Sequence, residues 1–68
     1  MKLFELETKR VNATEAWLEY TKLFPESEID IYDFNYSGYS FEEIREIFLR
    51  AVANHTELYR DRIPKKAV

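Results

Sequence analysis

Few side chains in this sequence could perform covalent or acid–base chemistry. His55, the single histidine, could serve as a general base or a metal ligand. It falls on an apolar helical stripe, however, and neither a cysteine nor a second histidine is present to complete a metal site. Ser37 and Ser40 flank Gly38, but Tyr-Ser-Gly-Tyr-Ser is not the G-x-S-x-G nucleophile elbow. We therefore interpret His55 as a residue at the edge of the core, Ser37 as a turn residue and Ser40 as a helix cap.

Two pairs of carboxylates, Asp30 with Asp33 and Glu42 with Glu43, could in principle carry out general acid–base catalysis. Neither pair fits a calcium-binding loop, and 68 residues leave little room for a deep cleft. One glycine cannot build a phosphate-binding loop, and a chain without cysteine has no disulfide, thiol nucleophile or iron–sulfur cluster. The sequence predicts a non-enzymatic protein with no catalytic residue, no metal and no cofactor.

The charged side chains are unevenly distributed along the chain. The net charge is only -3, but residues 26–46 hold seven acidic side chains and one basic one, whereas residues 47–68 hold five basic and two acidic ones. The acidic segment is also rich in aromatic residues, because Tyr32, Phe34, Tyr36, Tyr39 and Phe41 lie within ten residues of one another. Tyrosines among small polar residues are typical of protein-binding surfaces, although in a small domain such aromatics can instead fill the core.

These features predict a small protein-binding module or inhibitor that docks residues 28–46 on a basic site of a larger protein. An acidic rim around exposed tyrosines would suit such a partner and speed the encounter. A sharper version is a nucleic-acid mimic of the kind found among small phage or mobile-element proteins, an analogy of size and charge only. The predicted partner-binding residues are Asp30, Tyr32, Asp33, Tyr36, Tyr39, Glu42, Glu43 and Glu46.

The alternative is a nucleic-acid-binding regulator that uses the basic C-terminal end. Its predicted contacts are Arg60, Arg62, Lys65 and Lys66. Phosphate neutralisation by these groups would depend strongly on salt. We do not favour nucleic acid as a partner, because the chain as a whole is acidic and basic residues also complement the negative end of a helix dipole.

The size of the chain bears on assembly and location. A domain of this length without disulfides depends on dense packing or on oligomerisation, so a homodimer is one assembly that the sequence allows. No signal peptide or membrane span is visible, and we expect no membrane partner and a cytoplasmic location, in a host cytoplasm if the protein is phage-encoded.

The local patterns predict four elements in the order strand, helix, strand, helix. Residues 2–11 alternate in polarity as a strand does, with Phe4 and Leu6 pointing inward. Asn12 is predicted to cap a helix that ends before Pro25, and residues 28–34 are predicted to form the second strand.

The last predicted element is a long helix over residues 41–60. The Ser40–Glu43 capping box begins it, and Glu46 and Arg50 are expected to pair on its outer face. The predicted fold is a small α+β domain over residues 1–63, in which a minimal two-stranded sheet packs on two helices, followed by a short basic tail at 64–68. The sheet could form by a parallel crossover, or the second strand could pair with residues 37–41 as a hairpin.

Overall fold

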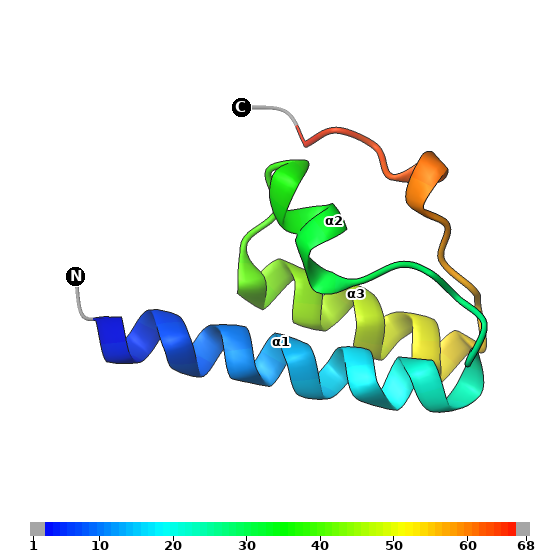
Figure 1. The fold of residues 1–68 in the computed structure, drawn as a ribbon, viewed down its shortest axis with the longest axis horizontal. Helices are drawn as coiled ribbons and strands as arrows, with labels where there is room; N and C mark the ends of the chain where they lie inside the picture. Colours follow the sequence, from blue (N-terminus) through cyan, green and yellow to red (C-terminus); the bar gives the residue numbers. More distant parts are fainter. Residues whose placement is uncertain (1–2, 67–68) are drawn as a thin grey trace.

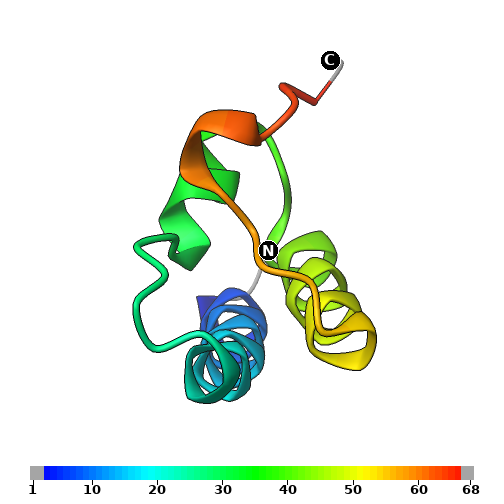
Figure 2. The same cartoon turned by 90° about the vertical axis from the view of Figure 1, so that its right-hand side faces the viewer.

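The computed structural model describes residues 3–66, with side chains from Glu5 onward. Its elements are α1 (Leu3–Leu23), α2 (Ile31–Tyr36), α3 (Phe41–Asn54) and a short 3-10 turn, η1 (Arg60–Arg62). In Figure 1, α1 and α3 lie side by side and run in the same direction, and the segment between them carries α2. Figure 2 looks along this helix pair and shows α2 and the C-terminal segment together as a second layer.

The predicted α+β fold is wrong, because residues 3–66 contain no strand. Residues 3–11 form the first half of α1, and Asn12, predicted as a cap, lies inside that helix. Leu6, predicted to point inward, is 44% exposed. The start of the predicted strand at residue 2 and the predicted inward position of Phe4 lie outside the description, as do residues 67 and 68 of the predicted tail.

The second predicted strand, over residues 28–34, is wrong too, because residues 28–30 belong to the connection after α1 and residues 31–34 belong to α2. Leu, Glu and Lys are good helix formers, and no glycine or proline occurs before Pro25, so nothing ends α1 at residue 11. The predicted end of this helix before Pro25 is confirmed, since α1 ends at Leu23.

The core lies where α1, α2 and α3 meet. Tyr20, Ile44 and Phe48 have the largest fully buried side chains. The ring of Phe48 lies 5.2 Å from the ring of Tyr20 and 5.5 Å from that of Phe34, which α2 supplies. Buried alanines of α1, Ala13 among them, let α1 and α3 approach closely.

The long C-terminal helix is confirmed at its start but is shorter than predicted. Ser40 accepts the N–H of Glu43 at 3.2 Å, and Glu43 accepts that of Ser40 at 2.9 Å, so the predicted capping box forms. α3 ends at Asn54 because His55 adopts the left-handed conformation, with φ of 53°. Thr56 N–H then bonds to Ala51 C=O at 2.9 Å in a Schellman motif, and the chain turns back across the helix layer.

The segment after α3 is anchored to all three helices. The Tyr20 hydroxyl on α1 accepts the N–H of Leu58 at 2.8 Å, and Arg60 Nε lies 3.0 Å from a carboxylate oxygen of Asp33 on α2. At the far end, Lys66 donates its backbone N–H to Ser37 at 3.1 Å and its ammonium group to Glu43 on α3. These contacts hold α2 between the helix pair and the C-terminal segment.

Candidate functional site

The six-residue helix α2 is fixed at its first turn by a reciprocal capping box. Asp30 Oδ1 accepts the N–H groups of Tyr32 and Asp33 at 2.8 and 3.2 Å, and Asp33 Oδ2 accepts the N–H of Asp30 at 2.9 Å. Such caps satisfy N–H groups that have no partner inside the helix. An isolated helix this short would not be stable, so its caps and its tertiary contacts must hold it in place.

The last turn of α2 is fixed equally closely. Ser37 Oγ donates to the carbonyl of Asp33 at 3.1 Å, and Asn35 donates to the carbonyl of Tyr39 at 3.1 Å. Gly38 follows with φ of 101°, a conformation that side-chain-bearing residues rarely adopt, and so allows the reversal toward α3. The helix is therefore positioned at both ends.

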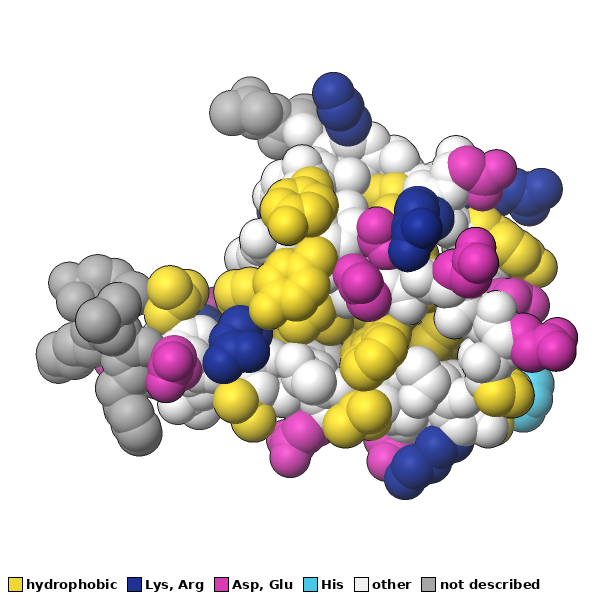
Figure 3. All heavy atoms as spheres, viewed as in Figure 1, with side chains coloured by type: hydrophobic (Ala, Val, Ile, Leu, Met, Phe, Trp, Pro, Cys, Tyr) yellow, Lys and Arg dark blue, Asp and Glu magenta, His cyan; other side chains and the backbone are white. Residues whose placement is uncertain are grey.

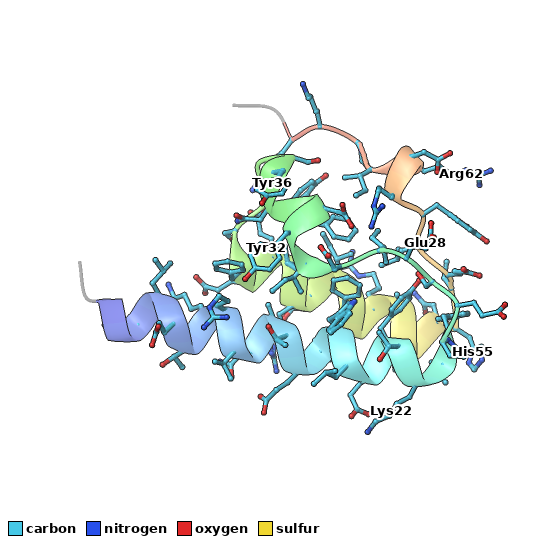
Figure 4. The ribbon with its side chains drawn as sticks, in the orientation of Figure 1. Lys22, Glu28, Tyr32, Tyr36, His55 and Arg62 are labelled. Atoms are coloured by element: carbon cyan, nitrogen blue, oxygen red, sulfur yellow. The ribbon has the colours of Figure 1, made fainter. Side chains whose placement is uncertain are left out.

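Two tyrosines project from this helix into solvent. Tyr36 is 84% exposed and Tyr32 is 41% exposed, and their ring centroids are 6.3 Å apart. Figure 4 shows both side chains on the face of α2 viewed in that figure, and Figure 3 shows hydrophobic side chains gathered over this region. We call Tyr32 and Tyr36 the tyrosine surface.

The other predicted aromatics of this segment belong to the core. Phe34 is only 4% exposed, and Phe41 packs partly buried against the core. Tyr39 stands edge-on to Phe34 at 5.8 Å and donates its hydroxyl to the carbonyl of Pro64 at 2.9 Å. Tyr39 therefore links α2 to the C-terminal segment instead of extending the tyrosine surface.

Three of the five predicted binding carboxylates are engaged inside the fold. Asp30 and Asp33 cap α2, and Glu43 caps α3 while accepting the ammonium group of Lys66. The hydrogen bond from Lys66 is the main cause that lowers the pKa of Glu43 from 4.5 to about 2, and the Ser40 N–H adds to it. The acidic charge of these groups thus stabilises helix N-termini.

The remaining two carboxylates, Glu42 and Glu46, lie on α3 and each forms an ion pair at the surface. Glu42 pairs with Lys9 of α1 at 2.9 Å and raises the pKa of that lysine, mainly through their hydrogen bond. The Glu46 carboxylate lies 3.5 Å from the guanidinium group of Arg45, and the ion pairs of the described residues do not include the predicted one between Glu46 and Arg50. Both glutamates line an open hollow of about 670 Å³ between α1 and α3, to which α1 adds Glu15 and Glu19. Lys9 and Arg45 line the same hollow, so its carboxylates are partly neutralised. The sequence did not predict this hollow, because no local pattern indicates that α1 packs on α3.

The predicted basic cluster is partly neutralised. Arg60 pairs with Asp33 and donates to the carbonyl of Glu28 at 2.6 Å, and Lys66 pairs with Glu43. Arg62 lies over the ring of Tyr59 at 5.1 Å, and Lys65 is exposed. The four residues therefore do not act as one set of free cations.

The remaining side chain that the sequence singled out for its chemistry is His55. His55 ends α3 and stands edge-on to the ring of Phe24 at 5.8 Å. Within these residues, no three His, Asp or Glu side chains are grouped so that they could hold a metal ion. None of the helices in this part of the chain combines the length and the apolar character needed to cross a bilayer. Comparison of the chain with protein-family models, curated proteins and solved structures finds no match.

Proposed function

We propose that this chain is a non-enzymatic protein-binding module that docks the tyrosine surface of α2 on a basic surface of a larger protein. The observation that carries the proposal is the exposure of Tyr36, 84%, on a helix held at both ends. Tyrosine is enriched among the residues that dominate binding energy, and a helix backbone that is already fixed need not be ordered on binding, which lowers the entropy cost. The proposed setting is the cytoplasm.

The basic character of the proposed partner follows from the carboxylates left at the surface. Glu28 is exposed at the start of the capped segment, and the Glu42 side chain is 69% exposed despite its pairing with Lys9. Exposed ion pairs contribute little stability, so Glu42 can exchange Lys9 for a cation on a partner. Charge of this kind mainly accelerates encounter and selects the partner.

The geometry favours a tyrosine-centred contact over nucleic-acid mimicry. The carboxylates of Asp30 and Asp33 accept backbone N–H groups at the start of α2. They are therefore not free to take the places of successive phosphate groups in a nucleic acid. Arg60 and Lys66 are likewise occupied by carboxylates, which reduces the charge available to bind nucleic acid.

The test is site-specific photocrosslinking in the organism that makes the protein. A benzophenone amino acid replaces Tyr36 in one variant and Leu18 in a control, because Leu18 is also exposed, at 46%, but lies on α1 and lines neither proposed binding surface. We expect one protein to crosslink from position 36 and not from position 18.

The captured protein is then purified for binding measurements. The double change Tyr32→Ala and Tyr36→Ala should weaken its binding at least about tenfold, and Leu18→Ala should not. Binding should also weaken when salt is raised from about 50 to about 300 mM. Equal crosslinking from both positions, or undiminished binding by the double variant, would exclude the tyrosine surface as the docking site.

A further inference from the structure

An apolar groove runs between α3 and the segment that folds back over it. Its larger part has a volume of about 550 Å³, and a smaller hollow of about 190 Å³ adjoins it through the shared residues Ile47, Thr56 and Leu58. We call the two together the C-terminal groove. Its apolar lining includes Phe34, Tyr39, Ile47, Leu58, Tyr59 and Ile63.

The walls of this groove are fixed by the same contacts that anchor the C-terminal segment. Leu58 is held by its N–H bond to the buried Tyr20 hydroxyl, and the Tyr39 hydroxyl binds the carbonyl of Pro64 at the other end. The Schellman motif at His55 sets the direction in which the segment leaves α3. The groove is thus preformed, as binding sites for apolar ligands usually are.

The charges around the groove are opposite in sign to those of the whole chain. Arg62 lines the larger part and Arg50 lines the smaller hollow, against the single carboxylate of Glu57. Among the described residues, neither arginine has a carboxylate within ion-pair distance. The groove therefore combines an apolar lining with one arginine in each of its two hollows, neither of them in an ion pair with a described residue. Such a surface complements a ligand that is both apolar and acidic.

We infer that the C-terminal groove binds a peptide segment of a partner protein that carries carboxylates beside two or three large apolar side chains. A peptide fits better than a compact small molecule because the groove is open and extends across two adjoining hollows. The tyrosine surface does not line the groove, so this second contact stands independently of the proposed function. A protein with both surfaces could hold a basic and an acidic partner together.

The test uses synthetic peptides and the full, isotope-labelled chain observed by NMR. One 12-residue amphipathic peptide carries leucines on one face and glutamates elsewhere, and a second replaces every glutamate with lysine. We expect the acidic peptide to shift the amide signals of Ile47, Ala51 and Leu58, and to bind at least about tenfold more tightly than the lysine peptide.

Three changes at the groove sharpen the test. Arg50→Glu combined with Arg62→Glu should reverse the preference toward the lysine peptide, and Glu57→Gln should strengthen acidic-peptide binding a few-fold. Thr56→Trp should fill the groove and abolish binding, whereas Leu18→Trp, on an exposed position of α1, should not. Dispersed amide spectra identify the variants that remain folded.

Several outcomes would overturn the inference. They are equal binding of the two peptides, full binding by a folded Thr56→Trp variant, and shifts at Tyr32 and Tyr36 in place of the groove. If groove signals instead change as the chain is concentrated without peptide, a second copy is the occupant and the inference fails. The Tyr32→Ala and Tyr36→Ala variant should bind the acidic peptide normally, so failure here is distinct from failure of the proposed function.

Discussion

The hydroxyl of Tyr20 accepts the backbone N–H of Leu58 at 2.8 Å, across 38 residues of sequence. The same hydroxyl lies 2.8 Å from Ser27 Oγ and 3.3 Å from the carbonyl of Leu58. One buried side chain of α1 thus forms hydrogen bonds with two separate segments. One is the connection between α1 and α2, which contains Ser27, and the other is the segment after α3, which contains Leu58. Because Leu58 lines the C-terminal groove, this contact joins the core to the second proposed binding surface.

Removing this hydroxyl should destabilise the protein without changing its packing. Tyr20→Phe keeps the ring in contact with Phe48 but leaves the N–H of Leu58 without its acceptor, which should cost about 1–3 kcal/mol in the free energy of unfolding. Urea denaturation followed by circular dichroism measures the change. Tyr39→Phe is the control, because its hydroxyl bond to Pro64 is exposed and its loss should cost less. Equal losses of stability from the two changes would show that the buried Tyr20 hydrogen bond contributes no more than the exposed one of Tyr39.

The low pKa of Glu43 predicts how stability depends on acid pH. Since its pKa is about 2 in the folded chain against an ordinary 4.5, the ionised carboxylate stabilises the fold above pH 4.5. This contribution should fall away as the pH drops through about 2. Lys66→Gln removes the main cause of the shift and should bring the Glu43 pKa closer to 4.5, as measured by carboxyl carbon NMR.

The stability measurements for this pair need a matched control. Lys65→Gln removes the neighbouring exposed lysine and should leave the pKa of Glu43 unchanged. Between pH 4.5 and 2, the Lys66→Gln variant should lose less stability than the wild type, and added salt should narrow the difference. Superimposable titrations of the wild type and the Lys66→Gln variant would contradict the assigned cause.

Sequence patterns located the start of α3 but not the fold class. The Ser40–Glu43 box is a local signal, and the apolar spacing from Phe41 to Val52 matches the side that meets the core, with Ile44, Phe48 and Ala51 buried. The alternating polarity of residues 2–11 led to the wrong prediction of a strand, because such a pattern is also compatible with a helix when Leu, Glu and Lys supply it. The packing of α1 on α3, a long-range interaction, decides between the two.

The candidate site was only partly predictable for the same reason. Exposure of Tyr36 follows from its place near a turn, but the roles of Asp30 and Asp33 as caps depended on recognising α2 as a helix. The spacing of Asp30 and Asp33 is that of a capping box and could have signalled it. The C-terminal groove carries no such signal, because nothing local indicates that the chain turns back after Asn54.

Backbone strain at His55 provides a further test. A non-glycine residue at φ of 53° is disfavoured, so His55→Gly should relieve that cost. Its ring also contacts Phe24, and His55→Ala removes the same contact while keeping Cβ. The glycine variant should therefore be more stable than the alanine variant by about 1 kcal/mol in thermal unfolding. If alanine proves the more stable, α3 does not end in the left-handed conformation.

Two substitutions of Asp30 distinguish its structural role as the cap of α2 from a role in binding. Asparagine caps helices about as well as aspartate, so Asp30→Asn should keep nearly all the stability. Asp30→Ala loses the acceptor for the N–H groups of Tyr32 and Asp33 and should cost about 1 kcal/mol in urea unfolding. The amides of α2 should also exchange faster with solvent in the alanine variant alone. Similar destabilisation by both changes would point to the charge of Asp30, and not to the cap.

Tyr36 should contribute almost nothing to folding. Its side chain is 84% exposed, and its ring contact with Tyr32 at 6.3 Å is worth only a few tenths of a kcal/mol at helical i,i+4 spacing. Tyr36→Ala should therefore change the free energy of unfolding by less than about 0.5 kcal/mol, whereas Phe34→Ala, in the same helix but buried, should cost about 3–5 kcal/mol. Chemical denaturation of the two variants measures both values. A large, exposed aromatic that is dispensable for stability is what a docking residue requires, and a loss near that of Phe34→Ala would instead assign Tyr36 to the fold.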